Sequence, residues 1–322
     1  MKAILLKKYG PPTGLQVEEV AKPEPTEHQV LVKIHATAIN DYDWSMVRGR
    51  PLAYQLLFGL GKPKHPIPGM ELSGTVEAIG NKVTQHQIGD AVYGDTSEYG
   101  FGTLAEYMCI DEKALLKKPD HMSFEEAASI PHAYGLAYQG LVEKGQISKG
   151  QNILINGAGG GVGSFALQIA KLYNTEVTGV DTGDKLNRMK SLGYDHIIDY
   201  KDQDFTKRSE QYDLILDAKT THGPLAYARV LKPDGRYVTI GGTMPTIIQV
   251  ALFGSLISRL HKKHLEVLAL VPNRDLDSID TLFSKKKLEC VIDGPYPLEE
   301  VPRLIQYFGE GKHTGKIIIK MA

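Results

Sequence analysis

The segment Gly157–Gly163 has the clearest chemical potential in the chain. It follows the apolar run NILIN and precedes the amphipathic stretch SFALQIAKLY. Its G-x-G-x-x-G register is filled by Ala158, Gly160 and Gly163, so alanine replaces only the first glycine. A glycine turn between a strand and a helix lets the main chain approach a pyrophosphate, and the free N–H groups of the helix start favour that charge. The segment therefore predicts a dinucleotide site.

A carboxylate in the right place extends this interpretation. Asp181 ends the next apolar run, EVTGVD, about 20 residues beyond the turn, where a carboxylate can bind an adenosine ribose diol. The same residue could instead cap the following helix, and Lys185 and Arg188 could meet a 2′-phosphate. The sequence favours NADH as cofactor and leaves NADPH open.

The pattern of residues 119–271 predicts the fold that holds this glycine turn. From residue 119 to residue 271, apolar runs alternate with amphipathic stretches, as in a Rossmann doubly wound parallel six-stranded sheet with helices on both faces. The expected helices lie near 162–173, 184–192, 224–231 and 247–260, and the expected strands are 152–156, 176–180, 196–199, 213–217, 236–240 and 266–270.

The two ends of the chain have a different sequence pattern. Residues 1–118 contain short strand patterns separated by Gly, Pro, Asn and Asp, which predicts a compact, mainly β barrel. Ser123, followed by two glutamates, predicts a helix start, and that helix is expected to run toward Leu141. The tail from 272 to 322 ends in KIIIK, a strand that needs a sheet, and is assigned to the first domain.

Composition excludes several other classes of protein. The 322 residues include 37 Lys+Arg against 38 Asp+Glu, so no overall field attracts nucleic acid or an anionic membrane. Only Cys109 and Cys290 occur, too few for a disulfide framework or a four-thiolate zinc site. The start reads as a strand rather than a signal, and the longest apolar stretch, 247–257, is too short to cross a bilayer. We expect a cytoplasmic protein.

Several further motifs carry a family resemblance. The chain resembles the medium-chain dehydrogenase/reductase superfamily, in its zinc-independent, quinone oxidoreductase-like branch. The motifs that carry the resemblance, besides the glycine turn, are MKAI, Gly10-Pro11-Pro12, Asn40-Asp41-Tyr42-Asp43-Trp44, Pro68-Gly69-Met70-Glu71, Val76–Gly80, Gly89-Asp90, Leu192-Gly193, Ile198-Asp199-Tyr200, Ile240–Gly242, Pro297–Glu300 and Gly315-Lys316.

The resemblance implies an architecture and a cofactor site. It implies a GroES-like catalytic domain over 1–118, a Rossmann dinucleotide-binding domain over 119–271, and a return segment, 272–322, that completes the first domain. Cofactor and a small-molecule substrate would meet in the cleft between the domains. The residues implied to contact the cofactor are Asn40, Gly160, Gly161, Val162, Asp181, Lys185, Tyr200, Gly241, Gly242 and Lys316.

The resemblance also indicates whether a catalytic zinc ion is expected. Zinc-dependent relatives use a Gly-His-Glu segment, which reads Gly69-Met70-Glu71 here, and no cysteine lies near Asn40–Asp43. A thioether does not suit zinc, so we expect no zinc. His65, His121 and His132 are interpreted as surface or capping residues rather than ligands. Without a metal to polarise a carbonyl, the implied chemistry is hydride transfer from NAD(P)H to a quinone or an α,β-unsaturated carbonyl compound.

The candidates for catalysis are Asn40, Tyr42, Asp43 and Tyr54. A tyrosine in the loop that holds Tyr54 can donate a proton to a developing enolate oxygen. Tyr54 is alternatively a hydrophobic loop anchor, and Asp43 with Trp44 is alternatively a structural corner. The identity of the proton donor stays open.

Departures from the family pattern keep two other functions open. Asp41 stands where the branch has proline, Leu136 where it has threonine, and Lys219 places a charge beside the expected nicotinamide end. Leu136 and Lys219 would support a nucleotide-binding protein with little turnover. Asp181 would also fit an NAD-dependent alcohol dehydrogenase, although Met70 and the missing cysteines argue against that function. The helix at 247–260 is either a crossover helix or part of a homodimer interface. The sequence does not name the acceptor.

Overall fold

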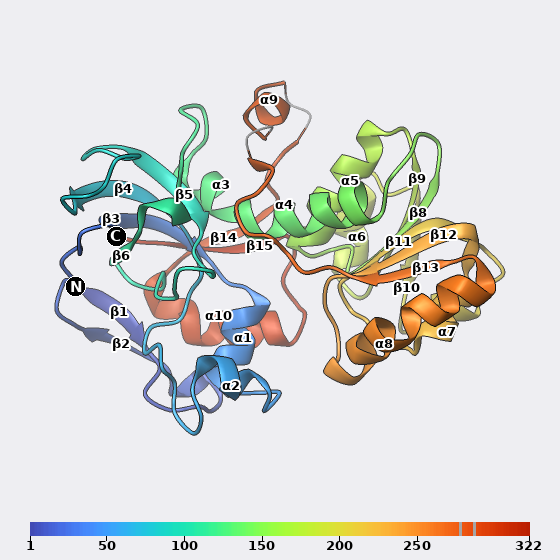
Figure 1. Ribbon diagram of the computed structural model, residues 1–322, viewed down its shortest axis with the longest axis horizontal. Helices are drawn as coiled ribbons and strands as arrows, with labels where there is room; N and C mark the ends of the chain where they lie inside the picture. The colour runs from blue at the N-terminus through green and yellow to red at the C-terminus, as the bar shows by residue number, and fades with distance from the viewer. Residues whose placement is uncertain (277–278, 286–287) are drawn as a thin grey trace. The chain divides into compact units, whose positions relative to one another are not determined.

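The computed structural model describes residues 1–276, 279–285 and 288–322, and their contacts form two compact units. The first unit comprises Met1–His132, Pro272–Leu276 and Ile292–Ala322, so both ends of the chain belong to it (Figure 1). The second comprises Ala133–Val271 and the described residues between Asp277 and Val291.

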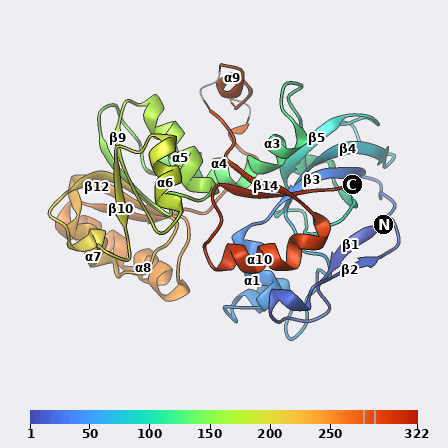
Figure 2. The same cartoon turned by 180° about the vertical axis from the view of Figure 1, so that it is seen from behind.

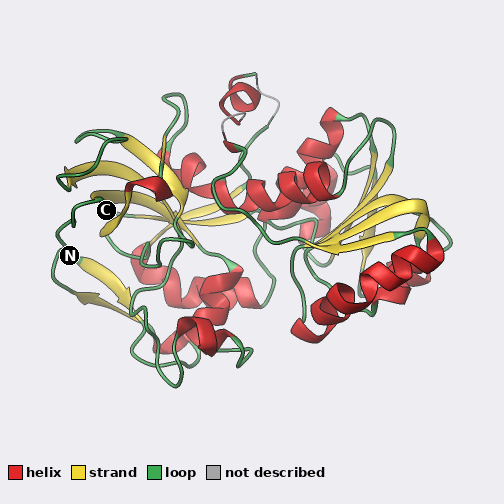
Figure 3. Ribbon diagram, viewed as in Figure 1, coloured by secondary structure: helices red, strands yellow, loops and turns green. Residues whose placement is uncertain are grey.

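The first unit is built on a mixed seven-stranded sheet with a separate two-stranded ribbon (Figure 3). The strand order is β14-β15-β3-β4-β5-β7, with β6 also paired to β3, and only β14 and β15 run parallel to each other. The ribbon is formed by β1 (Lys2–Leu5) and β2 (Gln16–Glu19). The sheet strands are β3 (Gln29–Ala38), β4 (Glu71–Ile79), β5 (Ala91–Asp95), β6 (Tyr107–Asp111), β7 (Leu116–Lys117), β14 (Ile292–Pro297) and β15 (Lys316–Lys320). The predicted GroES-like β domain is confirmed. KIIIK forms β15, which pairs with β3 in this sheet.

Short helices cover this sheet and close its core. Inward side chains such as Ile34, Leu72 and Ile317 are almost completely buried in one apolar cluster. The α-helices are α1 (Asp41–Arg48), α2 (Tyr54–Phe58), α3 (Phe124–Ser129) and α10 (Val301–Gly309), and the 3₁₀ turns are Pro12–Gly14, Glu112–Ala114 and Leu298–Glu300.

The helix expected to run from Ser123 toward Leu141 is divided. Ser123 and Glu126 form the predicted start as a reciprocal capping box, but α3 ends at Ser129. A new helix, α4 (Pro131–Tyr138), follows, and then a π-helix, Gln139–Lys144. The division falls at a proline because Pro131 has no N–H to continue the hydrogen-bond ladder of α3.

The second unit contains the predicted six-stranded parallel sheet, whose strands are labelled in Figure 1 and follow the order β10-β9-β8-β11-β12-β13. All five pairings are parallel, as right-handed crossovers require. The strands are β8 (Asn152–Asn156), β9 (Glu176–Asp181), β10 (His196–Asp199), β11 (Tyr212–Asp217), β12 (Leu231–Thr239) and β13 (His264–Val267). The order reverses direction between β8 and β11, where doubly wound sheets bind their ligands.

Helices lie on both faces of this sheet, with α5 on one side and α7 and α8 on the other (Figures 1 and 2). The further helices of this unit are α5 (Gly161–Leu172), α6 (Lys185–Leu192), α7 (Pro224–Arg229), α8 (Met244–His261) and α9 (Ile279–Ser284), with a 3₁₀ turn at Phe205–Lys207; α9 lies apart from the sheet (Figure 1). Among the described helices, none combines the length and the apolar character that spanning a membrane requires.

Candidate functional site

The glycine turn connects β8 to α5 as the sequence predicts. Gly157 has φ +87°, a conformation that favours glycine, and Gly160 caps α5. A side chain at Gly163 would place its Cβ 2.4 Å from the Ala158 carbonyl oxygen, so only glycine allows this approach. The first N–H groups of α5, starting at Gly161 and Val162, have no acceptor within the helix. The turn therefore offers an anion such as a pyrophosphate a set of backbone donors.

Asp181 ends β9 directly beside this turn. Its Oδ2 accepts a hydrogen bond of 2.9 Å from the Gly159 N–H, and its Oδ1 lies 3.5 Å from the Nζ of Lys185. The Asp181 and Lys185 side chains are both buried, and desolvation lowers the pKa of Lys185. Tyr200, whose N–H donates to the Asp181 carbonyl, is 54% exposed. The structure thus gathers Asp181, Lys185 and Tyr200 around the predicted adenosine end.

Residues at the carboxyl ends of β8, β11 and β12 form the rest of the predicted cofactor site in this unit. Asp217 is fully buried and accepts hydrogen bonds from Asn156 Nδ2, the Tyr237 hydroxyl and the Lys219 N–H, while desolvation raises its pKa. Gly241 follows β12 and accepts from the Thr220 N–H, and Gly242 pairs with the same residue. Gly241 and Gly242 therefore belong to the loop edge that carries the glycine turn. Lys219 is held at this edge by its backbone N–H, which donates to Asp217.

In the first unit, a buried polar triad joins two of the predicted site residues. Asn40 caps α1, and its Nδ2 donates to Glu71 Oε2 at 2.8 Å. Lys316, on β15, donates to Asn40 Oδ1 and forms a 2.6 Å ion pair with the same Glu71 oxygen. All three side chains are nearly inaccessible. Glu71 is the partner that the sequence interpretation missed, although it lies in the Gly69-Met70-Glu71 segment compared with the zinc-binding motif.

The Asp43 carboxylate accepts hydrogen bonds from backbone groups at the start of α1. Its two carboxylate oxygens accept 2.8 Å hydrogen bonds, one from the Asn40 N–H and one from the Gly69 N–H. Desolvation raises the pKa of Asp43 to about 7, against the opposing effect of these two donors. Both oxygens are engaged and the side chain is buried, which fits the structural-corner alternative better than contact with a substrate.

Tyr42 and Tyr54 lie in one aromatic group. Their ring centroids are 6.3 Å apart, and Phe58 contacts both rings, stacking on Tyr54 at 5.7 Å. Desolvation, followed by the charge of Asp41, raises the pKa of Tyr42 to about 12, and desolvation also raises that of Tyr54. Tyr54 is the first residue of α2 rather than a loop residue, and its ring packs as a hydrophobic anchor. Both hydroxyls remain protonated at neutral pH.

His132 departs from the surface or capping role that the sequence suggested. It is 6% exposed, and its ring lies between the carboxylates of Asp95 and Asp41. No local pattern announces this arrangement because its members come from α1, the end of β5 and the start of α4. Only the fold of the first unit brings them together.

The residues at the position of the zinc-binding motif do not fit zinc. Met70 is fully buried and offers only a thioether, and Glu71 is committed to Lys316 and Asn40. Among the described residues, no group of three or more His, Cys, Asp or Glu side chains forms a metal-binding cluster.

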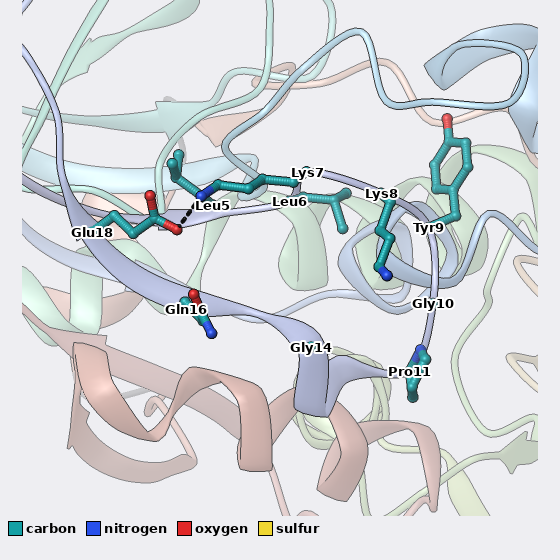
Figure 4. Close-up of a pocket in the computed structure, with 10 residues that line it drawn as sticks. All are labelled: Leu5, Leu6, Lys7, Lys8, Tyr9, Gly10, Pro11, Gly14, Gln16 and Glu18. Carbon is teal, nitrogen blue, oxygen red and sulfur yellow. Dashed lines mark ion pairs between the residues drawn. The ribbon is translucent and has the colours of Figure 1, made fainter.

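A separate hollow lies beside the β1–β2 ribbon (Figure 4). Lys7 and Glu18 form a 2.7 Å ion pair there. None of the residues that line this hollow belongs to the predicted site: Leu5, Leu6, Lys7, Lys8, Tyr9, Gly10, Pro11, Gly14, Gln16 and Glu18.

Comparison with known proteins assigns the chain to a family. Residues 26–120 match the alcohol dehydrogenase GroES-like domain, and residues 192–319 match a family described as zinc-binding dehydrogenase. The chain is 34% identical to 2-methylene-furan-3-one reductase of Solanum lycopersicum, over 99% of this chain and 79% of that protein. It is 31% identical to the chloroplastic NADPH-dependent alkenal/one oxidoreductase of Arabidopsis thaliana, with the same coverage.

A solved structure agrees with these matches. The quinone oxidoreductase from Coxiella burnetii superposes with a TM-score of 0.85 at 28% identity, covering 100% of this chain and 99% of that one. The chain therefore belongs to the medium-chain dehydrogenase/reductase superfamily, in its quinone oxidoreductase-like branch.

Proposed function

We propose that this protein is an oxidoreductase that reduces quinones or α,β-unsaturated carbonyl compounds with a reduced nicotinamide nucleotide. The observation that carries the proposal is the glycine turn at the N-terminus of α5, with the Asp181 carboxylate beside it. The names of the similar proteins, a furanone reductase and an alkenal/one oxidoreductase, support the acceptor class. When bound, the nicotinamide supplies a hydride.

The residues of the second unit would bind and orient the nucleotide. The N–H groups at Gly161 and Val162 would hold the pyrophosphate beside Gly160, whose own N–H donates to the Gly157 carbonyl. Asp181, Lys185 and Tyr200 would surround the adenosine ribose, and the Gly241–Gly242 loop would pass near the nicotinamide. We assign cofactor binding to the second unit, which contains Ala133–Val271, and acceptor binding to the first unit, which contains Met1–His132 and Ile292–Ala322. The Rossmann domain expected over 119–271 therefore differs from the observed unit at its start, because residues 119–132 pack with the first unit.

We propose that NADH is the preferred cofactor. Asp181 places a buried negative charge at the ribose position, and this charge opposes a 2′-phosphate. Lys185 would otherwise favour that phosphate, but its ammonium group is already paired with Asp181. The NADPH dependence named for the Arabidopsis relative is the opposing observation.

In the first unit, Asn40 and Lys316 would contact the cofactor through a rigid triad. Because Glu71 neutralises Lys316, the triad brings polar donors without net charge. Tyr42 is the stronger candidate for delivering a proton, since Asp43 is occupied by backbone groups and Tyr54 is stacked on Phe58. A phenol with a raised pKa keeps its proton until a more basic oxygen develops on the acceptor.

The test is the rate of reduced-nicotinamide oxidation, with NADH and NADPH in parallel, against ortho-quinones, 2-enals, enones and simple ketones. We expect turnover with quinones or enones that a chelator leaves unchanged, and a higher kcat/KM with NADH. Binding of cofactor without turnover would instead favour the nucleotide-binding alternative, which Lys219 and Leu136 suggest. Chelator-sensitive alcohol oxidation would favour an alcohol dehydrogenase.

Two further properties remain predictions from the sequence. A homodimer is expected, and the helix predicted at 247–260 is either a crossover helix or part of the dimer interface; in α8 the side chains of Ile248, Leu252, Phe253, Leu256 and Leu260 are exposed. A cytoplasmic location is also expected, although the name of the Arabidopsis relative places that protein in the chloroplast.

A further inference from the structure

The first unit contains an acid–imidazole–acid array that no part of the proposed function uses. The Nδ1 atom of His132 lies 2.9 Å from Asp95 Oδ2, and its Nε2 atom lies 3.6 Å from Asp41 Oδ1. The side chains of His132 and Asp95 are 7% and 0% exposed, whereas that of Asp41 is 58% exposed. The array therefore runs from the interior to the surface of the unit.

The surroundings of His132 hold it in the charged form. Desolvation acts to lower its pKa, but Asp41 and Asp95 outweigh it and raise the pKa to about 10. The other ionisable groups near His132 are Glu71, whose Oε1 accepts a 2.6 Å hydrogen bond from the backbone N–H of His132, Lys316, which pairs with Glu71, and Tyr42. At neutral pH both ring nitrogens carry protons and face carboxylates.

This charge is paired with the first residue of α1. Asp41 is the first residue of that helix, between the cap Asn40 and the candidate donor Tyr42. The Tyr42 ring also meets the His132 ring edge-on, with centroids 6.1 Å apart. The imidazolium that pairs with Asp41 therefore restrains both the backbone before Tyr42 and the Tyr42 ring.

We propose that the Asp41–His132 ion pair is a positioning device that orients the Tyr42 hydroxyl for proton delivery. The inference rests on the proposed reductase function. As the hydride forms a bond to the acceptor, the acceptor's π electrons move to its oxygen, and that oxygen takes the proton as the Tyr42 O–H bond breaks. The Tyr42 phenolate then regains a proton from water. His132 keeps its proton throughout and acts through Tyr42.

The first test is a double-mutant cycle of Asp41→Asn, His132→Gln and the double variant, with His196→Gln as control. His196 forms a comparable ion pair with Glu176, but on the exposed surface of the second unit. We expect each single variant to lower kcat about tenfold, and the double variant to lose no more than H132Q alone. The KM for NADH should change less than about twofold, since the pair acts on Tyr42 rather than on the nucleotide site.

The pH profile separates positioning from a general loss of structure. The kcat of the wild type should fall as His132 loses its proton near pH 10, and this alkaline limb should be missing in H132Q. If H132Q does not fold, D41N carries the test, because Asp41 is more than half exposed. Additive losses, or variants with wild-type kcat and profile, would overturn the inference.

The pKa of His132 can also be measured in protein without cofactor. In protein with ¹⁵N-labelled histidine, NMR should show one imidazole that titrates far above 6.5, and D41N should lower that pKa. An imidazole that titrates normally in the wild type would overturn the inference whatever the activity. Wild-type protein with no turnover on any acceptor would overturn the proposed function and the inference together, whereas turnover unaffected by the variants would overturn the inference alone.

Discussion

The Asp181 carboxylate binds two groups beside the predicted ribose site. Its carboxylate accepts the Gly159 N–H and pairs with the buried Lys185. The same group that would bind the ribose diol therefore also restrains the cation that would bind a 2′-phosphate. Cofactor choice in this chain depends on this pair rather than on either residue alone.

We predict that Asp181→Asn shifts the cofactor preference toward NADPH. The amide keeps the shape of the side chain but releases Lys185, so the ratio of kcat/KM for NADPH to that for NADH should rise about tenfold, an effect of about 1.4 kcal/mol. Asp184→Asn is the matched control, because Asp184 is an exposed acid in the same loop. An unchanged ratio would show that Asp181 only supports the turn.

A second prediction at the residue scale concerns Glu71. Glu71→Gln leaves the Lys316 ammonium buried without its counter-charge, which should lower the free energy of unfolding by about 3–5 kcal/mol in urea denaturation. The double variant Glu71→Gln/Lys316→Met removes both charges and should recover part of this loss. A double variant less stable than E71Q would contradict the ion-pair explanation.

At the scale of elements, the contact of α5 with the end of β8 sets the shape of the glycine turn. Gly163 lies so close to Ala158 that an added Cβ has no room without a shift of backbone. The N-terminal turn of α5 would have to move away from the strand, and its N–H groups would move with it. The anion site is therefore a property of the strand–helix contact.

Gly163→Ala should consequently weaken nucleotide binding and stability together. We expect a loss of about 1–3 kcal/mol in the free energy of unfolding from overpacking. Calorimetric titration with NADH should show a raised Kd in the same variant. Gly223→Ala is the control within the same unit, because its nearest contact would be 3.5 Å, an ordinary van der Waals distance. Equal effects of the two substitutions would argue against the packing explanation.

At the scale of the whole molecule, buried ionisable groups make stability depend on pH. The folded-state pKa of His132 is about 10, above its value of about 6.5 in an unfolded chain. A group with a raised pKa contributes its full stabilisation below pH 6.5, loses it progressively as pH rises, and contributes none above about pH 10. Asp41 and Asp95 have lowered pKa values, so their contribution is lost instead in acid.

We therefore predict that the free energy of unfolding falls between pH 7 and pH 10, by about 2–4 kcal/mol from His132. Urea denaturation at several pH values measures this slope. In His132→Gln the slope over this range should be reduced, because the group that releases the proton is missing. A wild-type slope retained in H132Q would assign the effect to other groups.

The sequence by itself determined the local and periodic features of this protein. Strand and helix periodicity placed the six parallel strands, the glycine turn identified its own strand and helix, and the serine of the capping box marked the start of α3 at Ser123. These features depend on residues close together in the chain, so local propensity and hydrophobic pattern suffice to predict them.

Only the tertiary structure decided which distant charges meet. Glu71 joins Asn40 to Lys316 across 276 residues, and His132 joins Asp41 to Asp95 from three separate elements. No spacing rule connects such residues, because their contact depends on strand register and on where α3 ends and α4 begins. Burial then decides their charge state, since the cost of removing an ion from water must be offset by partners that the fold supplies.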